Sequence, residues 1–218
     1  MSKEYKIKTK SEKISSALGL NAAFYVIQDF LQLLTMIVLV RILVPENYAI
    51  YALVIATHGL VGAFGHQSFI AHSLQVDVKS KIDYDVHMTF SGFIQLFCFC
   101  LCNIIAFFYK GSGDLQGISI FLHVLSLTFI IEWFSELIFK IYERNESWKR
   151  RRLLQLISSF ATSILSIFLA LNGFGVWALV IPSTLQNLIF LYDLFFYHRW
   201  KFSLNLNWGK YKSAWIFG

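Results

Sequence analysis

This sequence predicts an all-α polytopic membrane protein with six transmembrane helices, and three observations support that fold class. First, the chain contains six apolar runs, each long enough to cross a hydrocarbon core of ~30 Å at 1.5 Å per residue. Second, 17 of its 19 Lys and Arg residues fall in alternate segments between these runs. Third, 56% of the residues are hydrophobic and the mean hydropathy is +0.57, which is far from the composition of a soluble domain.

The six apolar runs follow one another with short connections, and each is expected to form one membrane-spanning helix. In chain order they are Leu18–Ile42, Tyr48–His72, His87–Tyr109, Leu115–Phe139, Leu153–Leu171 and Phe174–Tyr197. The longest internal connection, Lys140–Arg152, has only about a dozen residues, too few for a soluble catalytic or nucleotide-binding domain.

The basic residues fix the expected orientation of these helices. They gather before the first run and after the second, fourth and sixth runs: Lys3, Lys6, Lys8, Lys10 and Lys13; Lys79 and Lys81; Lys140, Arg144, Lys149, Arg150, Arg151 and Arg152; Arg199, Lys201, Lys210 and Lys212. Only Arg41 and Lys110 lie on the other side. Because short loops rich in Lys and Arg remain in the cytoplasm, both termini are expected to be cytoplasmic.

The same pattern predicts the organisation of the chain. Residues 1–17 form a basic cytoplasmic N-terminus, residues 18–197 form the six-helix transmembrane lobe, and residues 198–218 form a basic and aromatic cytoplasmic tail. The net charge is +6, but the basic residues flank the apolar runs. Anionic lipid headgroups are therefore the expected partner, and nucleic acid is not.

Cofactor and metal chemistry are not expected. The chain has no phosphate-binding glycine loop and no metal-ligand spacing. Cys98, Cys100 and Cys102 alternate along one helix, so successive thiols point about 200° apart and cannot converge on one ion. His72 and Asp77 have the H-x4-D spacing of some acyltransferases. That spacing also arises by chance and here straddles a helix end, so an enzyme is not predicted.

Polar residues inside the apolar runs are a better guide to function, because they are costly in a membrane and usually face the bundle interior. Several recur at steps of three and four on the first helix and form one stripe: Asn21, Tyr25, Gln28, Gln32 and Thr35. Asp29 borders this stripe near mid-membrane, where an ionised carboxylate costs roughly 2.5–3.5 kcal/mol. It must be protonated, paired or in contact with water.

Similar stripes occur on three other helices: Tyr51, His58, Gly62 and His66; Gln155, Ser159, Thr162 and Ser166; Ser183, Gln186 and Asn187. Small and hydroxyl residues are also the ordinary packing surface between membrane helices, and this interpretation is preferred for Gln155–Ser166. For the first two helices a hydrated, substrate-facing surface is preferred. We expect Gln28, Asp29, Gln32, His58 and His66 to line a transport cavity, with Asp29 and the two His residues able to exchange protons.

Two motifs resemble a known family. Arg41–Leu53 (RILVPENYAIYAL) resembles the R-x-L-G-P-x-x-Y-G-x-Y-A-L signature between the first two helices of polysaccharide transporters, and Asn172–Val180 (NGFGVWALV) resembles their G-x-G-V-W-A-L-V hairpin. These transporters belong to the multidrug/oligosaccharidyl-lipid/polysaccharide (MOP) flippase superfamily, which includes Wzx-like oligosaccharide flippases. The chain departs from the first signature at Val44 and Ala49, where the family has Gly.

The resemblance implies the N-terminal lobe of a MOP-type flippase in the bacterial inner membrane. Such proteins have two six-helix lobes around a central cavity, and they move oligosaccharides linked to undecaprenyl pyrophosphate between leaflets. This chain matches the first lobe only, so a truncated product, a split gene and a homodimer of half-transporters all stay open. A repeat-built transporter binds its substrate between its repeats. The alternatives are a non-transporting scaffold of a glycan-assembly complex and an integral membrane glycosyl- or acyltransferase.

The resemblance also gives Arg41 two possible roles. It could end the first helix by reaching the headgroups or by pairing with Glu46 across the turn at Pro45. Alternatively, its planar guanidinium could bind the pyrophosphate of the carrier lipid at the outer leaflet.

Overall fold

The computed structural model describes residues 2–63, 84–111, 116–144 and 148–197. These residues form six α-helices and a short π-helix, with no strand among them: α1 (Ser2–Ile42), α2 (Pro45–Gly62), α4 (Tyr84–Lys110), α5 (Gln116–Arg144), α6 (Trp148–Leu171), α7 (Trp177–Tyr192) and η2 (Asp193–Tyr197). The prediction of an all-α protein is confirmed.

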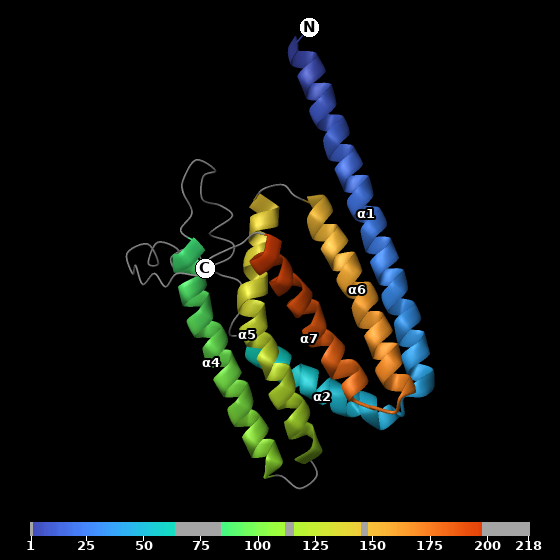
Figure 1. Cartoon of the computed structure of the whole chain (residues 1–218), viewed down its shortest axis with the longest axis vertical. Coiled ribbons are helices and arrows are strands. Elements are labelled where there is room, and N and C mark those ends of the chain that lie inside the picture. The colour runs from blue at the N-terminus through green and yellow to red at the C-terminus, as the bar shows by residue number, and fades with distance from the viewer. Residues whose placement is uncertain (1, 64–83, 112–115, 145–147, 198–218) are drawn as a thin grey trace.

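The helices form a bundle in which α1 is the edge (Figure 1). Helix α4 packs along α5, α5 packs on α7, α7 packs on α6, and α6 packs on α1. Helix α2 lies across the others rather than along them, and it contacts α4 and α5. The starts of α4 and α6 and the ends of α5 and α7 lie at one end of the bundle, as the predicted alternation of loops requires.

Five described helices are long and apolar enough to cross a membrane: Asn21–Ile42, Met88–Lys110, Gly117–Ser135, Lys149–Leu171 and Trp177–Tyr197. They correspond to the first and to the third through sixth runs of the sequence. Helix α2, the described part of the second run, is not among the five, and residues 64–72 of that run lie outside the described residues. Its first turn is polar, with Pro45, Glu46 and Asn47, and this lowers the hydropathy of the part that is described.

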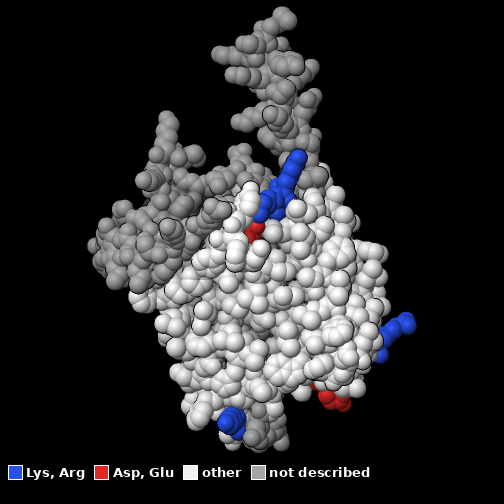
Figure 2. Space-filling view, viewed as in Figure 1, with Lys and Arg blue, Asp and Glu red and all other residues white. Residues whose placement is uncertain are grey.

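Charged side chains lie near the two ends of the described bundle, and the middle of the visible face is uncharged (Figure 2). Large apolar side chains such as Phe30, Phe97 and Ile164 are exposed on the described helices. A soluble protein rarely exposes so much apolar surface, whereas the hydrocarbon core of a bilayer requires it. The chain is therefore a multi-pass membrane protein.

The main core lies where α2, α4 and α5 meet. Val54 and Val61 of α2 are buried there against Cys98, Cys102 and other residues of α4 and α5. Nearby, α4 and α5 approach closely at Gly92, because a Cβ atom on this residue would lie 2.1 Å from the Trp133 ring. The Trp133 Nε1–H also donates to the Met88 carbonyl at 2.7 Å, which fixes the ring against α4.

The two motifs that define the family resemblance meet in space. Gly173 and Gly175 adopt positive φ angles of 77° and 55° in the turn between α6 and α7, a conformation that favours glycine. A Cβ atom on Gly175 would lie 3.3 Å from the Asn47 Oδ1 atom at the start of α2. The α1–α2 turn therefore packs directly on the α6–α7 turn.

Candidate functional site

A polar groove of about 400 Å³ opens between α1, α2, α6 and α7. Its walls combine amides, hydroxyls and two tyrosine rings with a few apolar side chains: Gln32, Thr35, Met36, Leu39, Tyr48, Tyr51, Thr162, Ser163, Ser166, Leu179, Pro182, Ser183 and Gln186. None of these described lining residues is charged. The groove can therefore accept a neutral polar ligand without having to neutralise a charge inside the membrane.

The hydroxyl groups of the groove are oriented by their own helices. Thr35 Oγ1 donates to the Leu31 carbonyl at 2.8 Å, Thr162 Oγ1 to Ser159 at 3.0 Å and Ser183 Oγ to Val180 at 2.6 Å. Each hydroxyl has one proton to donate and two lone pairs to accept with. Because their protons are already donated, these three hydroxyl oxygens can act toward a ligand only as hydrogen-bond acceptors.

The hydroxyl of Tyr48 is the most informative atom of the groove. It is buried, and it has no hydrogen-bond partner among the described residues. A buried polar group without a partner costs about 1–3 kcal/mol, so native structures rarely contain one unless a ligand or water completes it. Tyr48 is one of the residues that line the groove, and its hydroxyl can both donate and accept a hydrogen bond.

Of the three α1 residues predicted to line the transport cavity, one lines this groove and the other two do not. Gln32 lines the groove. Gln28 is half-buried and Asp29 is exposed elsewhere on α1. His66 lies outside the described residues. The prediction that all of these side chains share one hydrated cavity stays a prediction.

His58 faces α5 instead of the groove. Its Nε2 atom lies 2.8 Å from Thr128 Oγ1, and its ring stacks on Phe129 with 4.2 Å between centroids. Tyr51, from the same predicted stripe, does line the groove. The two residues have different neighbours because α2 crosses the bundle, so that its first turns lie beside α1 and α7 and its later turns lie on α5.

The stripes of the fifth and sixth predicted spans contribute more to the groove than the sequence suggested. Thr162 and Ser166 of α6 line it, although packing was the preferred interpretation for that stripe, and Ser183 and Gln186 of α7 line the opposite wall. Pro182 also lies in this wall, in the interior of α7, where it cannot donate a backbone hydrogen bond.

Arg41 is exposed in the last turn of α1 and lines a second, smaller groove of about 270 Å³ with Leu33, Met36, Ile37 and Val40. Within the described part of the chain it makes no ion pair, so the pairing with Glu46, one of the alternatives for its role, is not seen.

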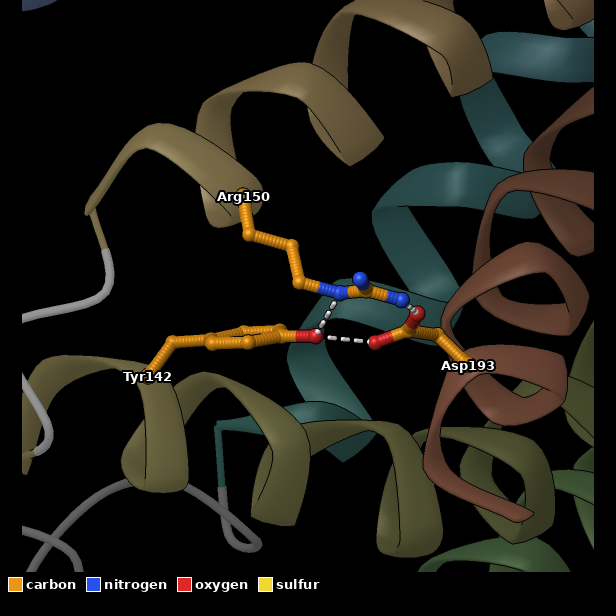
Figure 3. A network of polar contacts seen from close by, with 3 residues as sticks. All are labelled: Tyr142, Arg150 and Asp193. Atoms are coloured by element: carbon orange, nitrogen blue, oxygen red, sulfur yellow. Dashed lines mark hydrogen bonds and ion pairs between the residues drawn. The ribbon is translucent and has the colours of Figure 1, made fainter. Parts of the chain in front are cut away.

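A buried polar network joins three helices at the opposite end of the bundle (Figure 3). Arg150, in the first turn of α6, donates through one terminal nitrogen to Asp193 Oδ1 at 2.6 Å and through Nε to the Tyr142 hydroxyl at 2.8 Å. The Tyr142 hydroxyl donates in turn to the other oxygen of Asp193. Burial, together with the hydrogen bond to Asp193, raises the pKa of Tyr142, so this hydroxyl stays protonated.

Arg152, two residues further along α6, connects this helix to α1. Its Nε donates to Asn21 Oδ1 at 3.1 Å, and its guanidinium carbon lies 3.9 Å from the centroid of the Tyr25 ring. The polar stripe predicted on α1 therefore begins with two contacts to α6. The first turn of α6 anchors α5 and α7 through Arg150 and α1 through Arg152.

Sequence reasoning missed these networks, although some signals were present. Asp193 is a carboxylate inside an apolar run, and such a residue needs a partner. Glu132 is similar, since its Oε1 accepts from Asn187 Nδ2 at 3.0 Å.

A further interhelical network joins α4 to α5. The side-chain oxygen of Asn103 lies 2.6 Å from His123 Nδ1, and its amide nitrogen donates to Ser126 Oγ at 2.9 Å. Such bonds between membrane helices hold the bundle together.

The fold and the groove together define a class: a helical membrane protein with a polar, uncharged groove opening among its spans. Within that class, the profile of the family described as polysaccharide biosynthesis protein matches residues 38–218, and the chain belongs to this family. Comparisons with curated proteins and with solved structures find no match. The family membership agrees with the resemblance that the two motifs indicated.

Proposed function

We propose that this chain takes part in the export of lipid-linked oligosaccharide repeat units across the bacterial inner membrane as one lobe of a flippase. The glycan would be carried on undecaprenyl pyrophosphate, both termini would face the cytoplasm, and the protein would be a transporter and not an enzyme. A second lobe or a second copy of the chain would complete the cavity. Membership of a polysaccharide biosynthesis family supports this role.

The observation on which the proposal rests is that Tyr48 lines the groove while its hydroxyl is buried without a partner among the described residues. Sugars are neutral and carry many hydroxyl groups, so they match a site built from amides and hydroxyls. The groove offers them oriented acceptors from Thr35, Thr162 and Ser183, and the amides of Gln32 and Gln186 provide donors. The Tyr48 and Tyr51 rings add flat apolar surface for the faces of the sugar rings.

The test replaces groove residues and measures surface polysaccharide in the source bacterium after deletion of the native gene. Two lost hydrogen bonds of about 1 kcal/mol each correspond to roughly 30-fold weaker binding. The Gln32→Leu/Gln186→Leu double variant should therefore reach normal levels in the membrane, export far less polysaccharide and accumulate lipid-linked oligosaccharide.

Tyr48→Phe gives a second readout that a structural role would not produce. It removes an unsatisfied polar atom, so the stability of the protein should stay unchanged or rise while export falls. Tyr192→Phe is the matched control, because Tyr192 is exposed near the end of α7 and does not line the groove. Normal export by both groove variants, combined with loss of export on deletion, would favour a scaffold and exclude transport through this groove.

A further inference from the structure

The network between α4 and α5 fixes which nitrogen of His123 carries the proton. The Asn103 Nδ2 atom donates to the Phe99 carbonyl at 2.8 Å and to Ser126 Oγ at 2.9 Å. Because a carbonyl can only accept, the amide of Asn103 cannot be turned the other way. The Asn103 Oδ1 atom therefore faces His123 Nδ1 at 2.6 Å, and an amide oxygen in this position requires a proton on Nδ1.

The other ring nitrogen of His123, Nε2, is then left as an acceptor without a donor. A neutral imidazole carries one donor nitrogen and one acceptor nitrogen, and Nδ1 is the donor here. His123 is half-buried, and its Nε2 atom makes no hydrogen bond within the described residues. This atom is also not one of the fully buried atoms that lack a partner. The Nε2 lone pair can therefore be reached from outside the described bundle.

This lone pair lies inside the membrane among apolar side chains. His123 is six residues, ~9 Å, from the start of the Gly117–Ser135 span. The side chains one turn away from it on α5, and those that flank Asn103 on α4, are exposed. We call them the outer α4–α5 surface, which consists of Ile120, Leu127, Cys100, Ile104 and Phe107 around His123. Lipid tails offer no hydrogen-bond donor, so a bare acceptor on this surface is costly.

The outer α4–α5 surface lies apart from the polar groove. The residues that line the groove come from α1, α2, α6 and α7. Helix α4 lies on the opposite side of the bundle from α1 (Figure 1). A second lobe that completes the groove is therefore not placed to cover His123.

A second copy of the chain does not supply the missing donor either. In a two-fold symmetric contact, the outer α4–α5 surface would meet itself. The two amide protons of Asn103 are already donated, and the Ser126 hydroxyl donates to the His123 carbonyl at 2.7 Å. The exposed members of the surface are apolar except for the thiol of Cys100, which is a weak donor. Such a contact would set acceptor against acceptor.

We propose that the outer α4–α5 surface docks a transmembrane helix of another membrane protein, and that a hydroxyl or amide side chain of this helix donates a hydrogen bond to His123 Nε2. The exposed apolar side chains supply the packing area on which helix association in a membrane depends. The lone pair supplies the selectivity, because a helix without a donor at this depth leaves it bare. This docking does not rest on the proposed function, since it involves neither the groove nor its ligand.

Nitrogen NMR tests the position of the proton on the full chain in phosphatidylcholine nanodiscs. The protein is labelled with nitrogen-15 histidine, and the signals of His123 are assigned by their loss in His123→Asn. At neutral pH the ring should be protonated at Nδ1 alone. A ring protonated at Nε2, or at both nitrogens, would contradict the proposal.

Two substitutions of His123 separate docking from folding. The amide of an asparagine reaches the position of Nδ1, so His123→Asn keeps a donor to Asn103 and removes the acceptor at Nε2. The amide of a glutamine reaches the position of Nε2, so His123→Gln keeps an acceptor there and loses the bond to Asn103. A purely structural role would make His123→Gln the more damaging change, whereas docking requires His123→Asn to be.

Photo-crosslinking in native membranes of the source bacterium measures the docking itself. p-Benzoylphenylalanine replaces Ile120 on the outer α4–α5 surface or, as the control, Ile164 on an exposed face of α6. Position 120 should give one discrete adduct with another membrane protein, and position 164 should not. His123→Asn should lower the yield of this adduct by about fivefold, whereas His123→Gln should leave it within about twofold.

The captured helix must also carry the donor. Replacing its donor side chain by an apolar one of similar size should lower the yield by the same factor and should add nothing to the effect of His123→Asn. Three results would overturn the proposal: an adduct with a second copy, seen by mixing two differently tagged chains; adducts with lipid alone; or a partner whose yield is unchanged in His123→Asn.

Discussion

The network of Arg150, Tyr142 and Asp193 predicts a measurable coupling between α6 and α7. Arg150→Met keeps most of the apolar stem and removes the charge, whereas Asp193→Asn keeps the shape and removes the partner charge. The Asp193 side chain is only 5% exposed and the Arg150 side chain is 36% exposed. Arg150→Met therefore strands the more buried charge and should destabilise the protein more than Asp193→Asn does.

The size of the effect follows from burial. Removing one partner of a fully buried ion pair costs about 3–5 kcal/mol, and exposed pairs contribute about 0–1 kcal/mol. Because water reaches a third of Arg150, we expect ~3 kcal/mol for Arg150→Met, at the lower end of the buried range, and ~2 kcal/mol for Asp193→Asn, between the buried and exposed ranges. The double variant should cost less than the two single losses combined, with a coupling energy of ~2 kcal/mol.

The assay is a double-mutant cycle on the free energy of unfolding, measured by steric trapping in bicelles. Lys149→Ala is the control, because Lys149 is exposed in the same turn of α6 and makes no ion pair among the described residues. It should change the free energy by less than ~0.5 kcal/mol. A coupling energy near zero, with equal losses for the two single variants, would refute the reasoning that a buried charge pair joins these helices.

Three further predictions concern a close helix contact, a left-handed turn and the topology. Gly92→Ala places a Cβ atom 2.1 Å from the Trp133 ring and should destabilise the bundle by about 1–3 kcal/mol, measured by thermal unfolding. Gly59→Ala is the control, because its Cβ atom meets no atom within 4 Å, and it should be neutral or stabilising in that assay. Gly175→Ala, at a φ of 55°, should cost about 1–2 kcal/mol; an unchanged melting temperature would contradict the left-handed turn. In a chain without native cysteines, Lys149→Cys should be labelled only from the cytoplasm, and periplasmic labelling would reverse the proposed topology.

The spans could be predicted because each depends on local composition. Five of the six apolar runs are described helices long enough to cross a membrane, and the beginning of the second is α2. The helix ends were less accurate: α6 begins at Trp148 and not at Leu153, since its basic first turn continues the helix beyond the apolar run.

The candidate site was predictable only in part. Periodicity placed Gln32 and Thr35 on one face of a helix, and the structure places both on the groove. Tyr48 gave no signal beyond its place in a motif, because neither its burial nor its missing partner can be known from the chain alone. The sequence also could not predict that His58 would contact α5. His58 and Tyr51 belong to one stripe of α2, and a shared stripe implied that both side chains would face the same neighbouring helix.

The sequence by itself determined the class of protein, the number of apolar runs, the alternation of basic loops and the faces of each helix. These properties follow from residues within one or two turns of each other, or from the sum of charges in a loop. The tertiary structure decided which faces meet. Helix α2 crosses the bundle, so one stripe is divided between the groove and α5, and Arg150 finds Asp193 43 positions away along the chain. Such pairings depend on packing between helices that share no local pattern, and a side chain's spacing along its own helix carries no information about the helix that it will contact.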